Sequence, residues 1–317
     1  MATTPFLKDL GWRVEVAGLD LISLLLRLLP TDVASALGAA LFKALGPLTR
    51  PHRTAELGLR LAFPDMPQAA RARVLAGQWD NFGRYIFEFP LTDRLTPAGG
   101  RVEVVGGEHL AAVAASGRPA VLISGHFSNF EVMAAVIVDA GIACNVTYRA
   151  ANNPYVDQRI IDSRRRYGVT LFAPKGGEGA RELLEAMNAG RSVAMLNDQR
   201  YDIGVAAPFF GRPVMTNPAA ARLALRFGAP IQPMSIERLN GARFRCIIHP
   251  PIILADTGDR TADIEAGVGK INAFIEDRVR EHPGEWWWLH RRWPAEDYAE
   301  ALSSPSAGEG PRSGGGG

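Results

Sequence analysis

Short apolar runs alternate with longer helical segments between residues 100 and 284, and this alternation constrains the fold more than any other feature of the sequence. The run AVLIS (120–124) is bounded by turn residues, as is typical of a strand buried on both faces. The segment PYVDQRIIDSRRRYG (154–168) begins with proline and ends with glycine, as helices commonly do. Because strands and helices alternate, we expect an α/β fold with a mostly parallel central sheet flanked by helices on both faces.

The periodicity of the apolar residues places the individual elements of this fold. The last expected strand, 242–252, should lie at an edge of the sheet because two prolines halt it. The segment PKGGEG (174–179) lacks the Lys-Ser/Thr ending of a phosphate-binding loop, so we interpret it as a turn that enters a helix. The expected strands are 120–124, 143–149, 169–173, 192–198, 230–238 and 242–252, and the expected helices are 68–89, 108–116, 130–141, 154–168, 178–190, 217–228 and 263–284.

Two apolar stretches near the N-terminus suggest contact with a membrane. Residues 18–30 are strongly apolar but contain Asp20 and Arg27 and end at Pro30. They do not provide the roughly 18–20 uninterrupted apolar residues that a spanning helix needs. A second apolar stretch, 33–48, follows directly. We expect N-terminal amphipathic membrane-associating helices that lie on the bilayer surface; a pair of core-packed helices and a true span are the alternatives.

The composition is that of a globular protein with a sizeable core. Hydrophobic residues make up 47% and charged residues 21% of the 317-residue chain, which excludes global disorder. The formal net charge of +2 is too small to indicate nucleic-acid binding by itself. The two cysteines give neither a disulfide framework nor metal-ligand spacing. We expect N-terminal helices in 1–60, an α/β domain in 61–300 and a disordered Gly/Ser/Pro-rich tail in 301–317.

Polar side chains follow three of the expected strands at the point where each strand ends. His126 comes two residues after one strand, Arg149 ends a second, and Asp198 and Gln199 end a third. In parallel α/β sheets, active sites lie at the carboxyl ends of the strands. These three clusters therefore predict a functional site at that edge of the sheet.

The spacing of His126 and Glu131 indicates how the two side chains can cooperate. Five positions on a continuous helix correspond to about 140° around its axis, so the pair would not share a helix face. We therefore expect His126 in the strand-to-helix turn, with Glu131 reaching back from the first turns of the helix. Glu131 could then accept the proton of one imidazole nitrogen and leave the other nitrogen basic. This arrangement would suit removal of a proton from a hydroxyl.

Other interpretations of this segment remain open. The histidine could be a buried structural residue beside a helix cap formed by Ser128 and Asn129. A zinc site is less favoured because the other histidines are scattered along the chain. A covalent serine enzyme is disfavoured because the sequence contains no G-x-S-x-G elbow.

Blocks in a fixed order along most of the chain resemble the bacterial lipid A biosynthesis (late) acyltransferases, a family within the H-x4-D/E lysophospholipid acyltransferase superfamily. The block SGHFSNFE contains the histidine and glutamate of the superfamily motif. Two departures from the family pattern are Gly58, in place of an early asparagine, and Phe130, where tryptophan is frequent. The remaining blocks are LAFPD (61–65), NFGRYIFEF (81–89), TYRAANNPYVDQRIIDSRRRYG (147–168), VAMLNDQR (193–200), PFFGRPVMTNPAAARLA (208–224) and PGEWWWLHRRW (283–293).

The resemblance implies transfer of a fatty acyl group from an acyl thioester to a hydroxyl of a lipid A precursor or related glycolipid. It implies acyl carrier protein as partner, with acyl-CoA as the other possible co-substrate, and neither cofactor nor metal. It also implies a peripheral or singly anchored location on the cytoplasmic face of the cell inner membrane. Acyl transfer to another lipid acceptor, such as a lysophospholipid or an amino-acid lipid, is one alternative. A non-catalytic lipid-binding protein and a hydrolase are the others.

The resemblance also implies roles for individual residues. The expected catalytic residues are His126 as general base, Glu131 as the residue that orients it, and Arg164, where the family places a functional arginine. Arg164 could instead belong to a solvated helix face, Asp198 and Gln199 to a simple turn, and Thr216 with Asn217 to a helix cap. The residues expected to bind substrate are Arg149, Asn129, Asp198, Gln199 and Thr216.

The C-terminal cluster of tryptophans and arginines allows two interpretations. Trp and Arg side chains are common at a membrane interface. The same side chains could instead pack against the sheet, with the arginines pointing outward. The residues concerned are Trp286, Trp287, Trp288, Trp293, Arg291 and Arg292.

Overall fold

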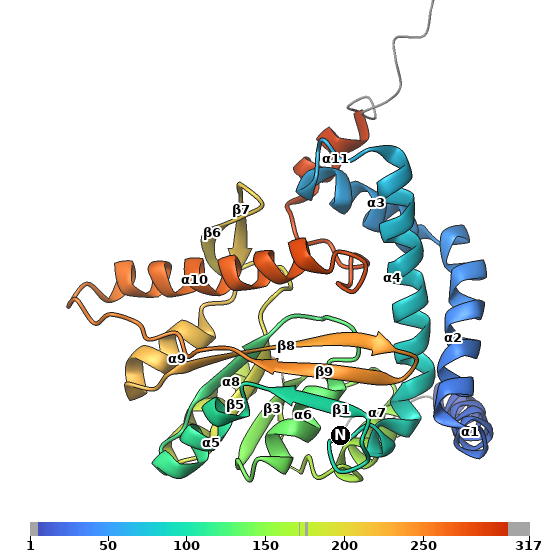
Figure 1. Cartoon of the computed structure of the whole chain (residues 1–317), viewed down its shortest axis with the longest axis horizontal. Helices are drawn as coiled ribbons and strands as arrows, with labels where there is room; N and C mark the ends of the chain where they lie inside the picture. Colours follow the sequence, from blue (N-terminus) through green and yellow to red (C-terminus); the bar gives the residue numbers. More distant parts are fainter. Residues whose placement is uncertain (1–5, 171, 175–176, 304–317) are drawn as a thin grey trace, which may run out of the picture.

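The computed structural model describes residues 6–170, 172–174 and 177–303, which form a seven-stranded sheet with helices around it (Figure 1). The strand order is β1-β9-β8-β2-β5-β3-β4. Neighbouring strands are parallel except for β8 and β9, which are antiparallel. The expected fold, a mostly parallel sheet flanked by helices, is therefore confirmed. The strands are β1 (Val102–Val105), β2 (Val121–Ser124), β3 (Cys144–Tyr148), β4 (Phe172–Pro174), β5 (Ser192–Leu196), β8 (Ile231–Asn240) and β9 (Arg243–Ile248).

The helices agree closely with the apolar periodicity of the sequence. The expected helix 68–89, for example, is α4 (Gln68–Glu88). Asn153 caps the first turn of α7 by accepting hydrogen bonds from two backbone N–H groups, as a preferred capping residue does. The other helices are α1 (Phe6–Leu28), α2 (Thr31–Leu45), α3 (Arg50–Ala62), α5 (Gly107–Ser116), α6 (Glu131–Asp139), α7 (Pro154–Arg165), α8 (Gly177–Asn188), α9 (Ala219–Phe227), α10 (Arg260–Glu281) and α11 (Ala295–Ser303), with 3-10 turns η1 (Gly46–Leu48) and η2 (Phe89–Arg94).

Two parts of the sheet differ from the sequence-based expectation. The expectation that 242–252 is an edge strand is wrong, because β9 lies between β8 and the unanticipated strand β1. Its prolines fall at 250 and 251, after the strand has ended, so they interrupt no ladder. A separate antiparallel hairpin, β6 (Val205–Phe209) and β7 (Arg212–Thr216), was also not expected. Pro208 and Pro213 face each other in this hairpin, and prolines weaken the sequence signal of a strand.

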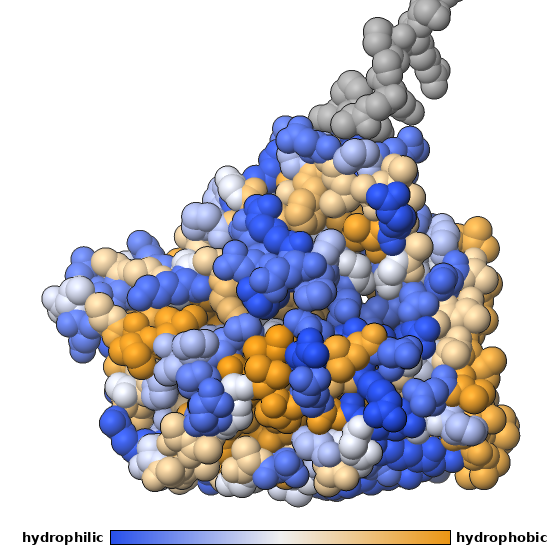
Figure 2. Space-filling view, viewed as in Figure 1, coloured by the Kyte–Doolittle hydropathy of each residue, from blue (hydrophilic) through white to orange (hydrophobic). Residues whose placement is uncertain are grey.

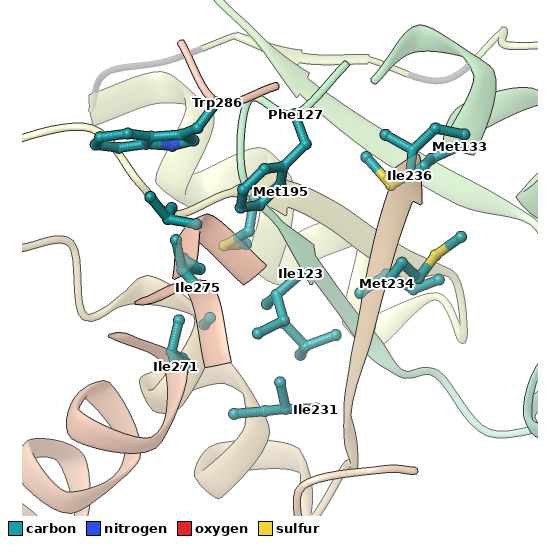
Figure 3. Close-up of a cluster of buried hydrophobic side chains, with 14 of the residues drawn as sticks. Ile123, Phe127, Met133, Met195, Ile231, Met234, Ile236, Ile271, Ile275 and Trp286 are labelled. Atoms are coloured by element: carbon teal, nitrogen blue, oxygen red, sulfur yellow. The ribbon is translucent and has the colours of Figure 1, made fainter. Parts of the chain in front are cut away.

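The core lies on the central strands and continues into the C-terminal segment. Ile123 of β2 and Ile231 of β8 are almost completely buried. Figure 3 shows them gathered with Ile271 and Ile275 of α10. Full burial of an aliphatic side chain of this size stabilises a fold by about 1.5–3 kcal/mol. The core therefore holds rigidly the strand from which His126 emerges.

The N-terminal helices α1 and α2 leave a broad apolar surface exposed. Figure 2 shows hydrophobic side chains along the edge of the molecule where these helices lie. The polar side of α1 contacts the rest of the chain, with Asp20 paired to Arg159 of α7 at 2.8 Å and Arg27 to Asp93 at 2.8 Å. The exposed side chains include Leu7, Leu10, Val14, Leu21, Leu24, Leu25 and Leu28 of α1 and Val33, Leu37, Leu41 and Leu45 of α2.

Within the described ranges, no helix combines the length and the apolarity that crossing a bilayer requires. The association of the N-terminal helices with a membrane surface stays a prediction.

The expected boundaries of the N-terminal region, 1–60, and of the C-terminal tail, 301–317, fall within helices α3 and α11. Ala55 and Leu59 of α3 belong to the main core cluster, so the expected N-terminal region, 1–60, includes residues of that core. Residues 301–303 belong to α11, and the remainder of the expected tail, 304–317, lies outside the described residues.

Candidate active site

A tight turn, residues 125–130, connects β2 to α6 and presents His126 at the carboxyl edge of the sheet. Ser128 in this turn has a φ of 43°, in the left-handed backbone region that residues other than glycine rarely adopt. The turn is held by the distant segment 285–287. The Ser128 N–H donates to the Glu285 carbonyl at 2.9 Å, and the Trp287 N–H donates to the His126 carbonyl at 3.1 Å. The C-terminal segment therefore fixes the backbone on which His126 sits.

His126 is paired with Asp198, which follows the neighbouring parallel strand β5. The imidazole Nδ1 lies 2.7 Å from Asp198 Oδ1, and the His126 backbone N–H donates to Oδ2 at 2.7 Å. The Trp286 indole N–H also donates to Oδ2, at 2.8 Å. A side chain at Gly125 would crowd this pairing, since a Cβ there would lie 3.2 Å from Asp198 Oδ2. His126 and Asp198 are 8% and 4% exposed, so the hydrogen bond is shielded from water.

The electrostatics of the pair favour a basic Nε2. Burial alone would raise the pKa of Asp198, but His126, its backbone N–H and the Trp286 indole hold that pKa well below its usual range. Asp198 is therefore an anion, and an anion next to Nδ1 favours the tautomer that carries its proton there. The Nε2 lone pair is then available to accept a proton.

Glu131 does not contact the imidazole through a hydrogen bond, so the expectation that it orients His126 is wrong. Its carboxylate forms a bidentate ion pair with Arg164, with distances of 3.0 Å to Nε and 2.6 Å to Nη2. The Tyr167 hydroxyl donates to it at 2.6 Å. Burial raises the pKa of Glu131, but Arg164 and Tyr167 outweigh burial and the pKa is lowered. The correct partner, Asp198, was expected to bind substrate.

The sequence places Asp198 at the end of a strand but does not reveal that it is the partner of His126. Asp198 lies 72 residues from His126, and the two meet because β2 and β5 are adjacent parallel strands whose carboxyl ends coincide. The position of both residues at strand ends predicted proximity. The strand order, which spacing does not reveal, decided which carboxylate reaches the ring.

The other residues that were expected to bind substrate occupy varied environments. Asn129 is completely buried, and its amide donates to Glu88 at 3.0 Å. Thr216 is also completely buried, where its hydroxyl accepts a hydrogen bond from Arg292 at 2.8 Å. Neither side chain is accessible to a substrate in this structure. Arg149 is exposed after β3, and Gln199 is half-buried beside Asp198.

An apolar cavity adjoins the turn. It is a half-open hollow between α6 and the central strands, and its empty space of ≈ 520 Å³ includes open solvent at its entrance. Glu131 and Arg164 form the charged part of a wall that is otherwise almost entirely apolar. The apolar lining includes Leu122, Ile123, Phe130, Met133, Ala134, Ile137, Val146, Ala194, Met195, Leu196 and Met234.

Most of the C-terminal tryptophans pack inside the protein, which agrees with the core-packing interpretation. Trp286, Trp288 and Trp293 are each at most 2% exposed. Trp287 is half-buried and lies over His126, with ring centroids 5.5 Å apart. Contrary to the expectation that both arginines point outward, Arg292 is buried, and only Arg291 of the two is exposed. Burial lowers the pKa of Arg292 to about 10.

A buried histidine–aspartate pair lies at the carboxyl edge of an α/β sheet, next to an apolar cavity. Comparisons with known proteins identify the family. The family model described as bacterial lipid A biosynthesis acyltransferase matches residues 15–295. The chain therefore belongs to this family and is an acyltransferase by class, as the sequence blocks indicated.

Individual relatives are identical to the chain at about a quarter of the aligned residues. A lipid A biosynthesis lauroyltransferase of Escherichia coli is 26% identical over 275 residues, which cover 83% of this chain and 86% of that protein. A phosphatidylinositol mannoside acyltransferase of Mycobacterium tuberculosis is 25% identical and covers 73% of each chain. A lipid A biosynthesis acyltransferase of Haemophilus influenzae is 24% identical, over 90% of this chain and 88% of that protein.

Proposed function

We propose that this protein transfers a fatty acyl group from an acyl thioester to a hydroxyl of a lipid A precursor or a related glycolipid. The observation that carries this proposal is the buried His126–Asp198 pair beside the apolar cavity. The pair supplies a base for the hydroxyl, and the cavity supplies an apolar site for the acyl chain. Family membership supplies the reaction class.

The reaction balances with His126 as general base. The acceptor hydroxyl gives its proton to Nε2 as its oxygen attacks the thioester carbonyl carbon. The tetrahedral intermediate then collapses, the carbon–sulfur bond breaks, and the departing thiolate takes up the proton from Nε2, which restores the neutral imidazole. General-base catalysis of this kind contributes typically about 10²–10⁴-fold to the rate.

The cavity suits the acyl chain because its walls are apolar and its charged residues neutralise each other. Arg164 and Glu131 form a bidentate pair, so the cavity presents no isolated charge to a hydrocarbon. We assign Arg164 and Glu131 to shaping this cavity and to supporting α6, which begins at Glu131. Met133, Met195 and Met234 line the cavity, and flexible methionines adapt well to a chain.

The lipid acceptor places the reaction at a membrane. The apolar side chains exposed on α1 and α2 support peripheral attachment to a membrane surface. We assign the cytoplasmic face of the inner membrane, because the carrier-bound or CoA-bound acyl groups are soluble on that side. The acyl donor that we propose is acyl carrier protein carrying a fatty acid, with acyl-CoA as the alternative.

The proposal is tested by incubating the purified protein with labelled acyl-carrier protein or acyl-CoA, with and without vesicles that contain an acceptor. A lipid A precursor and a phosphatidylinositol mannoside are tested separately, because the relatives carry both names. The expected result is an acylated glycolipid, detected by mass spectrometry, that forms only when the acceptor is present. Release of free fatty acid at the same rate with or without acceptor would instead indicate a hydrolase.

A further inference from the structure

We propose that Ala194 forms the floor of the apolar cavity and sets the length of the acyl chain that the protein transfers. The inference rests on the proposed function and extends it from the reaction to the choice of acyl donor. Its carrying observation is that Ala194 lines the cavity and is only half-buried, although strands β2 and β3 flank its own strand β5 on both sides.

The cavity runs alongside α6 from the carboxyl edge of the sheet toward its amino edge. Strands β2 and β3 both run parallel to β5, so α6, which connects β2 to β3, runs back in the opposite direction. Glu131 at the start of α6 therefore lies at the mouth, and Ile137 near the end of α6 lies deep in the cavity. At about 1.5 Å per helical residue, the step from Glu131 to Ile137 corresponds to a depth of about 9 Å.

Strand pairing identifies the residues at the deep end. Leu122 of β2 and Val146 of β3 both pair with Ala194, so the three side chains form one row across the sheet, and all three line the cavity. Ser192 and Cys144 pair two residues closer to the amino edge, on the same face of the sheet. They are 3% and 8% exposed, and neither belongs to the lining among the residues that the structure describes. The cavity therefore ends at the row of Ala194.

Within this row, Ala194 has the smallest side chain and lies between two larger ones, Leu122 and Val146. The accessible face of β5 continues toward the mouth at Leu196, which is also half-buried, whereas Val193 on the opposite face is completely buried. The cavity thus uncovers one face of a central strand. The last carbons of the acyl chain end in the gap above the Ala194 methyl group.

The distribution of polar groups decides which end of the donor enters the cavity. Glu131 begins α6 and Ser124 ends β2, so these polar residues of the lining lie toward the mouth, where His126 follows. The floor row is apolar throughout. Burial of hydrocarbon against the floor is favourable, whereas a polar thioester would lose its hydrogen bonds there. The chain therefore enters with its methyl end first.

The walls and the floor of the cavity differ in how far they can adapt. Met133 and Met234 line the walls, and their flexible side chains tolerate different positions of a chain. Ala194 instead belongs to an interior strand that is hydrogen-bonded to neighbours on both sides, so it cannot move aside for a longer chain. One methylene more or less in an apolar pocket changes kcat/KM by about 10–200-fold. A fixed floor therefore selects the chain by its length.

The test compares the full-length wild type with Ala194→Leu, using saturated acyl donors from butyryl to palmitoyl. Each acyl group is presented on acyl carrier protein and on CoA, with the glycolipid acceptor that the wild type uses. Leucine adds an isopropyl group to the floor, so kcat/KM for the longest donor that the wild type accepts should fall at least about tenfold relative to butyryl. Butyryl transfer itself should stay within about threefold of wild type.

Val146→Ala tests the same floor in the opposite direction. It shortens the side chain that pairs with Ala194, so it should raise kcat/KM for donors longer than the wild-type optimum. Ala115→Leu is the matched control, because it makes the same change at an exposed position of α5 outside the cavity lining. Its dependence on chain length should equal that of the wild type.

The possible failures can be told apart. A folded Ala194→Leu protein that keeps the wild-type dependence on chain length, or that loses the same factor for every donor including butyryl, would overturn the role of Ala194 alone. If circular dichroism shows that Ala194→Leu does not fold, Val146→Ala decides, and an unchanged chain-length dependence in that variant would overturn the floor. A wild-type protein that transfers none of the donors to any acceptor would overturn the proposed function as well.

Discussion

Asp198 is the residue whose substitution tests the orientation of His126. In Asp198→Asn, the side-chain amide can donate to Nδ1, which stabilises the tautomer with its proton on Nε2 and removes the basic nitrogen. We expect kcat to fall by about 10²–10⁴-fold, measured by steady-state transfer from a labelled thioester. Asp202→Asn is the control, since Asp202 lies in the same loop but its side chain is 83% exposed. A rate for Asp198→Asn within about threefold of wild type would contradict the assignment.

The same carboxylate makes stability depend on pH. His126 and Trp286 outweigh burial and lower the pKa of Asp198 in the folded protein, whereas the unfolded value is about 3.9. Its contribution is therefore present above the unfolded pKa and is lost as pH falls toward the folded pKa, because the unfolded chain binds the proton first. We expect the free energy of unfolding, measured by urea denaturation, to decrease from about pH 5 to pH 3. The decrease should be less steep for Asp198→Asn, and equal slopes would refute this linkage.

At the scale of elements, α2 and α4 cross at a contact that only glycine permits. A Cβ at Gly38 would lie 2.2 Å from the Gly83 carbonyl oxygen and 2.8 Å from Phe87 Cγ. Gly38→Ala must therefore separate the helices, and we expect a loss of about 1–3 kcal/mol in the free energy of unfolding. The measurement is chemical denaturation followed by circular dichroism.

Gly18 of α1 provides the matched control for this crossing. A Cβ there would have no neighbouring atom within 4 Å. Because alanine favours a helix over glycine, Gly18→Ala should be neutral or should stabilise by up to about 1 kcal/mol. Equal destabilisation by the two substitutions would show that the close crossing has no special cost.

At the scale of the whole molecule, the apolar surface of α1 and α2 should decide whether the protein binds lipid. Leu21, Leu25 and Leu28 are 58%, 53% and 73% exposed on α1, so their replacement by serine removes apolar area without opening the core. We expect the triple variant to lose at least about tenfold in affinity for anionic vesicles, measured by sedimentation. Ile253→Ser, at an exposed site elsewhere, is the control. Unchanged sedimentation of the triple variant would refute this surface as the membrane contact.

Much of this architecture could be predicted from local sequence patterns. The alternation of strand and helix, the position of His126 in a turn and the positions of His126 and Asp198 at the ends of their strands all follow from periodicity and end signals. The helix α4 and the strand β2 begin and end within a residue of the expected positions. These features depend on residues that are close together in the sequence, so they can be predicted from the amino-acid sequence of one chain.

The features that were missed depend on contacts between distant segments. Asp198 rather than Glu131 meets His126 because of strand order, and β9 is an interior strand because β1 joins its far side. The hairpin of β6 and β7 has prolines where strands usually avoid them. The tryptophans of 286–293 could belong to a membrane or to the core, and only the packing around Trp288 and Arg292 distinguishes the two.

The most direct test of the central claim, that His126 is the base of an acyltransferase, is the rate of acyl-ester formation by His126→Asn. The substitution preserves side-chain volume and polarity in part, and circular dichroism would establish that the fold is retained. We expect ester formation on the glycolipid acceptor to fall by about 10²–10⁴-fold or more relative to wild type. Ester formation by a folded His126→Asn protein at a rate close to that of the wild type would contradict this claim.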